Sequence, residues 1–388
     1  FMDNVDFISD LRLRGGFGIV GNQEIPNYLS LAILEPNSDF RAILGDEIQT
    51  GFALRQLANP DLRWEEKQEF TIGLDYGFID ERIVGSIEFY RNDTEDLLLQ
   101  ITVPQPAPVA TFVDNVGSVR NTGLDLALDY YAIEKADMNL QLGLVFNTNV
   151  NEILDLGGQD QIFTGSVSGR GQSGQQALLL TPGAPIPEFN GPELLRVNDA
   201  GDQVFNDYDA DGNLIGETTE PDAGDRQIIG DPRPDFSYGF RAQFDYKQFG
   251  ISAFIRGEQG RELFNNTALV FGNKSALPNT NVIASALDTP DAINEEARFS
   301  SRWIEDASFI RLDNITLEYR PDIARYAPFV RNTRVFLSVD NVFTITPYDG
   351  FDPEVNTNAQ IGLIPATGID YTNYPVARTF TLGVNLGF

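Results

Sequence analysis

The chain has 388 residues, with 27 Lys and Arg against 57 Asp and Glu, which gives a formal net charge of -30. It contains no His and no Cys, which excludes the usual catalytic triads and the usual zinc, copper, haem and iron–sulfur sites. The acidic balance argues against nucleic-acid binding through phosphates, whereas hard cations, which take oxygen ligands, are compatible with it.

Alternation of apolar and polar residues recurs along the chain and predicts β-strands, because successive side chains of a strand point to opposite faces. In chain order the alternating runs are 69–78, 83–90, 124–130, 140–146, 236–246, 249–257, 309–319 and 380–388. In the last run, Phe380 and Leu382 share one face and Thr381 lies on the other. In the run 309–319 the apolar phase slips near Asp313, which predicts a β-bulge.

The connections between these runs are of two kinds. Turns of hairpin length, Ile79–Arg82 and Lys247–Gln248, join two pairs of neighbouring runs. The segments 152–233 and 265–300 are long, polar and rich in Gly, Pro and Asp. Short turns on one side of a sheet and long loops on the other are typical of transmembrane β-barrels.

Neither a transmembrane helix nor a signal peptide is predicted. No apolar run approaches the roughly 18 residues that a transmembrane helix needs. The opening Phe1-Met2-Asp3-Asn4 lacks the basic and apolar regions of a signal peptide. We therefore expect a mature N-terminus or an internal cut.

A soluble β-sandwich or propeller would show the same alternation. Two features favour a membrane barrel instead. The polar faces are rich in Gly, Ser, Thr, Asn and Asp, and the chain holds only four Lys, where a solvated face would use more long charged side chains. Large aromatic residues stand near the strand ends, as in the aromatic girdles of membrane barrels: Tyr76, Phe78, Phe89, Tyr130, Phe146, Tyr246 and Tyr319.

Several segments, taken in order, match one family. Leu11–Gln23 is similar to a strand written LKLRASYGxxGNQ, and Asn59–Glu65 to a segment written NPDLKWE. Asn115–Gly123, Ser308–Asn314 and Gly350–Glu354 match further motifs at the expected intervals. Each match is weak alone, but their order and spacing are specific together. Over nearly its whole length the chain resembles the C-terminal part of the SusC/RagA-type TonB-dependent outer-membrane transporters.

The resemblance implies an all-β fold, in which residues 1–388 form the C-terminal part of a 22-stranded antiparallel barrel in the outer membrane of a Gram-negative bacterium. The family's plug domain, its TonB-contacting segment and its first barrel strands have no counterpart in these residues. A partial barrel would leave two open strand edges in lipid, where each unpaired amide is costly. We therefore expect an N-terminal part of the same protein, or a partner fragment, to complete it.

The function implied by the resemblance is active import of a nutrient, either a glycan or oligosaccharide or a peptide. Its partners would be a SusD-like surface lipoprotein docked on the loops 152–233 and 265–300, TonB acting through the absent plug segment, and outer-membrane lipid and lipopolysaccharide. No catalytic site and no nucleic-acid partner are expected. The aromatic loop residues could stack on sugars, but they are expected instead to pack the loops together or against a lid protein: Phe189, Phe205, Tyr208, Phe264 and Phe271. The alternatives are a passive porin-like or surface-structural barrel and a soluble secreted β-rich binding module.

The segment Asp207–Asn213 fits the D-x-D-x-D-G start of a calcium loop, in which carboxylates at alternate positions converge on one cation. The sequence therefore predicts a structural Ca²⁺ in an extracellular loop, with the ligands Asp207, Asp209, Asp211 and Asp225. An EF-hand would place Glu at the twelfth position of the loop, where this chain has Thr218. The alternative is an acidic turn that binds no metal.

Overall fold

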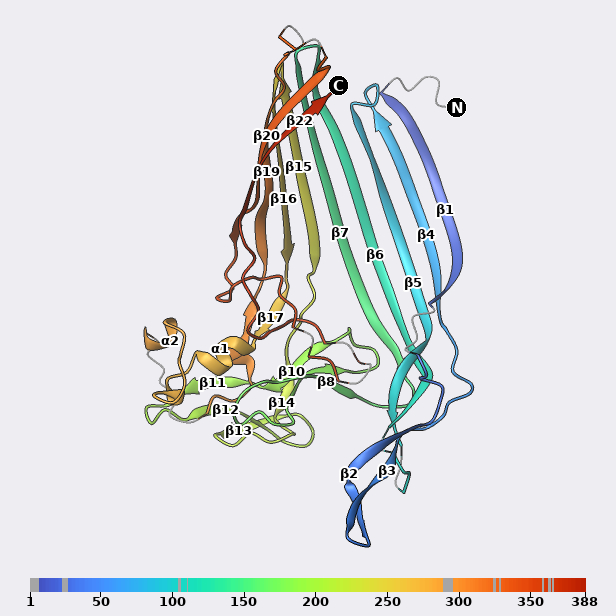
Figure 1. Cartoon of the computed structure of the whole chain (residues 1–388), viewed down its shortest axis with the longest axis vertical. Coiled ribbons are helices and arrows are strands. Elements are labelled where there is room, and N and C mark those ends of the chain that lie inside the picture. The colour runs from blue at the N-terminus through green and yellow to red at the C-terminus, as the bar shows by residue number, and fades with distance from the viewer. Residues whose placement is uncertain are drawn as a thin grey trace.

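The computed structural model describes residues 7–22, 27–103, 106–109, 111–288, 296–323, 326–327, 329–357, 359–361, 364 and 366–388. Its main element is a tall, curved ten-stranded sheet in the order β1-β4-β5-β6-β7-β15-β16-β19-β20-β22 (Figure 1). Every neighbouring pair is antiparallel. The strands are β1 (Ile8–Asn22), β4 (Glu65–Phe78), β5 (Ile83–Thr102), β6 (Thr111–Lys135), β7 (Met138–Leu156), β15 (Phe236–Tyr246), β16 (Phe249–Gln259), β19 (Phe309–Tyr319), β20 (Asn332–Ile345) and β22 (Thr379–Gly387).

The two faces of this sheet differ in character, as the alternation predicts. On one face, apolar residues lie opposite one another across five strands: Leu13, Leu74, Ile87, Leu126 and Phe146. The opposite face carries charged and polar residues at the intervening positions. Many side chains of the apolar face are exposed within the described residues. An apolar outer face and a polar inner face are the pattern of a transmembrane barrel wall.

Aromatic residues gather on the apolar face at the end of the sheet where the short turns lie. Tyr76 stacks on Phe78 with ring centroids 5.3 Å apart, and Phe249 stacks on Tyr319 at 5.0 Å. Tyr246 lies opposite Phe249 in the register of β15 and β16. These residues occupy the position of an interfacial girdle, as predicted from the strand ends. Phe89 and Phe146, predicted to belong to it, lie instead in the interior of β5 and β7.

Glycines allow some of these rings to lie flat on the neighbouring strand. Gly85 of β5 is paired with Tyr76 of β4, and a Cβ at Gly85 would lie 2.6 Å from the Tyr76 hydroxyl oxygen. On the polar face, Phe336 of β20 lies opposite Glu318 of β19 and covers Gly383 of β22 in the same way. Cross-strand cover of a glycine by a ring restores contacts that the missing side chain cannot make.

The predicted bulge in 309–319 is confirmed. The register of β19 with β20 shifts between Leu312 and Asn314, and the register of β16 with β19 shifts at Phe254 and Ile255. The extra residue is Asp313, whose carboxylate lies 3.2 Å from the Arg256 Nε atom. The bulge thus directs an acidic side chain toward an arginine of the neighbouring strand.

The first long connection, between β7 and β15, consists of short strands at the far end of the sheet from the short turns (Figure 1). They form two small sheets, ordered β14-β10-β9-β8 and β11-β12-β13. Their bounds are β8 (Ile162–Ser166), β9 (Gln176–Leu180), β10 (Glu188–Pro192), β11 (Leu194–Val197), β12 (Gln203–Tyr208), β13 (Leu214–Thr218) and β14 (Arg226–Gly230). The predicted loop 152–233 therefore begins inside β7, and it is rich in strands rather than irregular.

The remaining connections are also folded. β2 (Ile33–Leu44) and β3 (Glu47–Gln56) form a protruding hairpin between β1 and β4 (Figure 1). The segment 265–300, of which 289–295 lie outside the described residues, follows β17 and carries α1, η1 and α2. The bounds are β17 (Glu262–Asn265), α1 (Asn266–Phe271), η1 (Lys274–Ala276), α2 (Ser285–Asp288), η2 (Ser301–Trp303), β18 (Ile304–Asp306) and β21 (Ile369–Asp370). Within the described residues, no helix has both the length and the apolarity needed to cross a membrane.

The hydrophobic core lies among these connections and the strand ends next to them, such as Leu99 of β5 and Ile153 of β7. One cluster joins Leu178 and Phe189 to Phe264, Phe299 and Ile369, which come from four separate parts of the chain. Phe189, Phe205 and Phe264 are fully buried, as expected of residues that pack the loops together. The long connections therefore form one packed body at their end of the sheet, called the loop body below.

Candidate functional site

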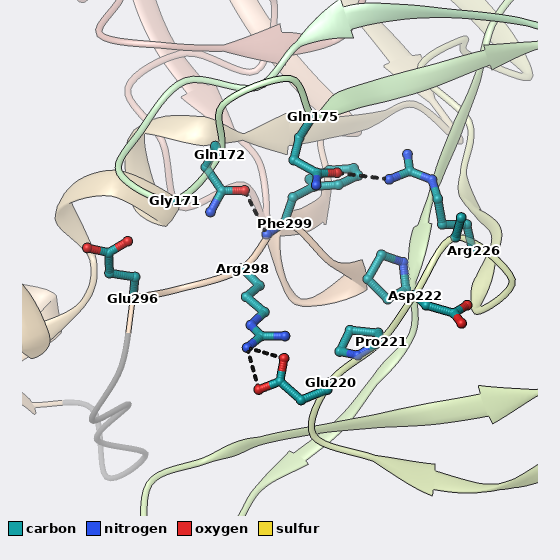
Figure 2. A pocket seen from close by; sticks show the side chains of 12 residues that line it. Gly171, Gln172, Gln175, Glu220, Pro221, Asp222, Arg226, Glu296, Arg298 and Phe299 are labelled. Atoms are coloured by element: carbon teal, nitrogen blue, oxygen red, sulfur yellow. Dashed lines mark hydrogen bonds and ion pairs between the residues drawn. The ribbon is translucent and has the colours of Figure 1, made fainter.

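A pocket of about 700 Å³ opens in the loop body (Figure 2). Three segments form most of its lining: the β8–β9 connection at Gly171–Gln175, the β13–β14 connection at Glu220–Ala223 with Arg226, and residues 296–299. Pro192 of β10 completes the lining. These segments are far apart in the sequence, so the site exists only once the loop body has folded.

Gln172 joins two of the three segments. Its side chain is 3% exposed, its Nε2 atom donates to the Ala297 carbonyl oxygen at 2.7 Å, and its Oε1 atom accepts from the Phe299 amide at 3.3 Å. Gly171 beside it has φ +72°, a conformation that favours glycine. Gln172 thus ties the β8–β9 connection to residues 296–299 at the floor of the pocket.

Arg226 is the charged residue most enclosed by this pocket. Its Nε atom donates to Asn190 Oδ1 at 2.9 Å, and its Nη2 atom donates to the carbonyl oxygens of Gln176 and Asn190. The Phe163 and Phe299 rings lie 5.7 and 6.0 Å from its guanidinium carbon. Burial lowers the pKa of Arg226, because the charged form loses hydration. Arg226 thereby holds β14 against β9 and β10.

The rim of the pocket carries ion pairs. The Arg298 Nη2 atom donates to both carboxylate oxygens of Glu220 at 3.0 Å, and this bond lowers the pKa of Glu220 (Figure 2). Arg170 pairs with Glu296 at 2.7 Å. The exposed Asp222 accepts a hydrogen bond from the Gly224 amide at 2.6 Å. The result is a polar pocket that can hold a small hydrophilic ligand.

The residues predicted as calcium ligands lie around the turn between β12 and β13. Asp209 accepts hydrogen bonds from the amides of Asp211 and Asn213, at 3.0 and 2.8 Å, and also from the Asn213 side chain. These bonds lower the pKa of Asp209. Gly212, with φ +79°, completes the turn. Asp207 lies in β12 opposite Gly216.

Asp225 stabilises the same hairpin from outside it. It is 3% exposed and accepts from the backbone amides of Tyr208 and Asp222, each at 2.8 Å. Among the described residues, no three acidic side chains are arranged closely enough to hold a metal ion. The Ca²⁺ site at Asp207, Asp209, Asp211 and Asp225 stays a prediction.

The polar face of the large sheet is the second candidate surface. Arg14 donates to Asp75 at 3.0 Å and to Glu88 at 2.9 Å, and Arg241 pairs with Asp129 at 3.0 Å. Charges on this face are thus largely paired with one another. A wall of paired charges and small polar residues attracts no single class of ion strongly, and it suits a hydrated path.

Sequence reasoning missed the pocket, because its lining segments are brought together only by tertiary contacts. One signal was available: Asp225 and Arg226 form an Asp-Arg pair just before the strand run 236–246. In the structure, Asp225 holds the β12–β13 hairpin from the β13–β14 connection, and Arg226 lines the pocket.

Comparison with known proteins identifies the family. Residues 5–342 match the family model described as TonB dependent receptor-like, beta-barrel. The chain is 30% identical to TonB-dependent receptor P3 of Formosa agariphila and 29% identical to TonB-dependent receptor SusC of Bacteroides thetaiotaomicron. These alignments cover 100% of this chain and 40% and 38% of the two relatives, so the chain spans about two fifths of their length.

A solved structure agrees with this assignment. The RagAB peptide importer in its closed-closed state matches with a TM-score of 0.82 and 26% identity, over 100% of this chain and 42% of that chain. The all-β fold and the outer-membrane location predicted from the sequence are confirmed. The chain belongs to the family of TonB-dependent receptor β-barrels, in its SusC/RagA branch, and forms part of an outer-membrane barrel.

Proposed function

We propose that this chain forms the wall and the outer loop body of a barrel that imports a nutrient across the outer membrane, driven by TonB. The observation that carries the proposal is the match to an importer over the whole chain, with a TM-score of 0.82. The paired charges of the polar face support it, because they suit the passage of a hydrated molecule. We assign no catalytic step to these residues.

The cargo we propose is a glycan or oligosaccharide or a peptide. Both kinds are polar molecules too large for simple diffusion through a narrow pore, which explains the need for energised transport. RagAB, the solved relative, is described as a peptide importer. The polar pocket of the loop body lies outside the barrel wall, where an incoming ligand would first meet the protein.

The partners we propose are a SusD-like surface lipoprotein, TonB, the N-terminal part of the same protein, and the membrane itself. The lipoprotein would dock on the loop body, where the small sheet β11-β12-β13 exposes Leu195, Leu214 and Ile215. Lipid would cover the apolar face of the large sheet. Lipopolysaccharide would be held through divalent cations, because the chain has a net charge of -30.

Uptake measurements separate this proposal from a passive barrel. The full-length protein is expressed, with and without its lipoprotein partner, in a host that lacks its own importers, and entry of labelled oligosaccharides and peptides is followed. We expect uptake that stops when the proton-motive force is collapsed or TonB is deleted. Uptake that continues unchanged under both treatments would support the porin-like alternative.

A further inference from the structure

Arg226 is a largely buried cation that has no carboxylate partner among the described residues. Within the part of the chain that the structure describes, no carboxylate lies within ion-pair distance of its guanidinium. Glu220 and Glu296, two acids of the same pocket lining, are bound by Arg298 and Arg170. Burial of a charge without a counter-charge is costly, and an anion that enters the pocket would offset this cost.

The hydrogen bonds of Arg226 show where such an anion would bind. A guanidinium has five N–H donors. The Nε donor and both Nη2 donors are taken up by Asn190 and Gln176 in the wall of the pocket. Nη1 has one partner among the described residues, the Gln175 side-chain oxygen at 3.3 Å, and Gln175 is exposed. The Nη1 edge is therefore held by one long bond to a side chain that can move away.

The rest of the lining limits the charge of the ligand. Asp222 is exposed at the rim and has no cationic partner among the described residues, and the chain as a whole is strongly acidic. A polyanion would be repelled by these charges. A ligand with one anionic group, on an otherwise neutral polar molecule, would meet Arg226 without this repulsion.

We propose that this pocket binds a small polar ligand through a single carboxylate or sulfate group, which replaces the Gln175 amide oxygen on the Nη1 edge of Arg226. The proposal deepens the import function and rests on it, since it names the chemistry that the loop body selects. Arginine suits this role, because its guanidinium stays charged at physiological pH and its Nη1 group keeps two N–H donors for an anion while the other nitrogens are held by the protein.

Binding of matched trisaccharides to the full-length protein in detergent tests the proposal. The probes are neutral galactotriose, the same sugar with one terminal uronate, the same sugar with one 6-sulfate, and a fully oxidised form with three carboxylates. We expect the two singly charged probes to bind at least about tenfold more tightly than the neutral one, as charge-assisted hydrogen bonds require. The two arms distinguish carboxylate from sulfate, and the triply charged probe should bind more weakly than either.

Two substitutions at the exposed Gln175 control for folding. Gln175→Glu places a carboxylate beside Arg226, so it should raise the melting temperature and abolish binding of both charged probes. Gln175→Ala frees the Nη1 edge and should preserve or strengthen binding. Arg226→Lys keeps the charge but cannot make the bonds to Asn190 and Gln176 that fix the guanidinium in the pocket, so it should weaken binding about tenfold.

Three results would overturn the proposal: equal binding of charged and neutral probes, no binding of either singly charged probe, or unchanged binding in Gln175→Glu. None of these results bears on energised uptake, which is measured separately in cells. If the protein imports a neutral nutrient but binds none of the charged probes, the pocket assignment is wrong and the import function is still supported.

Discussion

Arg311 of β19 and Asp352 of the β20–β22 connection form an ion pair of 2.8 Å in which each side chain is only 5% exposed. Arg311 also reaches Glu354 at 2.7 Å and donates to the Thr344 hydroxyl at 2.9 Å. Arg256 of β16 binds the same Glu354. Two barrel strands are thus joined to the last long connection, which continues into the loop body through the pairing of β21 with β17.

Substitution of Arg311 should detach the β20–β22 connection from strand β19. Arg311→Ala leaves Asp352 buried without a counter-charge, and breaking a buried pair from one side costs about 3–5 kcal/mol. The matched control is Arg196→Ala, which removes an exposed pair with Glu217 and should have a much smaller effect, because solvent screens that pair. Thermal unfolding and hydrogen exchange of residues 346–378 in the full-length protein provide the measurement. Equal effects of the two substitutions would contradict the anchoring role of Arg311.

Glu305 should make the loop body less stable as the pH rises. Burial, with Asp349 and Asp370 nearby, raises the pKa of Glu305 above its ordinary value of 4.5, against hydrogen bonds from Asn265 and from the Asp349 amide. An acid whose pKa is raised by folding gives up stability as the pH climbs from the ordinary value through the folded value. Glu305→Gln should therefore gain stability relative to the native protein at high pH and lose that gain at low pH.

Melting curves of both proteins between pH 4 and pH 8 measure this difference. The exposed Glu217, whose pKa is lowered by Arg196, supplies a control of opposite sign, since Glu217→Gln should lose stability at high pH. A difference between Glu305→Gln and the native protein that does not change with pH would show that Glu305 is charged equally in the folded and unfolded states.

The calcium prediction is tested by adding and removing the ion. If Asp207, Asp209, Asp211 and Asp225 bind Ca²⁺, chelation should speed proteolysis within 207–225, and added Ca²⁺ should reverse the effect. Asp209→Asn should abolish the response to Ca²⁺ while keeping an acceptor for the Asn213 amide. Proteolysis that is the same with chelator and with Ca²⁺ would leave Asp209 as the acceptor of an acidic turn and nothing more.

The sequence predicted the parts of the fold in which each residue faces one of two distinct environments. The run 236–246 coincides with β15, because lipid on one side and water on the other impose alternation. The strands of the loop body were not predicted, because their two faces lie in similar environments. In β9, Ala177, Leu178 and Leu180 are all buried, so both faces are apolar and no alternation appears.

The pocket and the ion-pair anchor depend on contacts between distant segments. Residues 308–314 and 350–354 were singled out as family motifs, yet their spacing says nothing of the bond between Arg311 and Asp352. Arg226 likewise meets Gln175 and Phe299 only through tertiary packing. The calcium motif at 207–213 is a local pattern, so the sequence alone reveals it. The same pattern of acidic residues also fits a turn without metal, in which Asp209 accepts hydrogen bonds from the amides of Asp211 and Asn213.

We expect the large sheet to act as a barrel wall, with lipid on one face and a water-filled path on the other. Neighbouring residues of β15 test it, because Phe240 and Arg241 point to opposite faces and this chain has no native cysteine. Each is replaced by Cys in the full-length protein, and labelling by a water-soluble maleimide is measured in intact outer membranes. We predict that Arg241→Cys is labelled and Phe240→Cys is not. Equal labelling at both positions, or labelling of Phe240→Cys alone, would contradict the account.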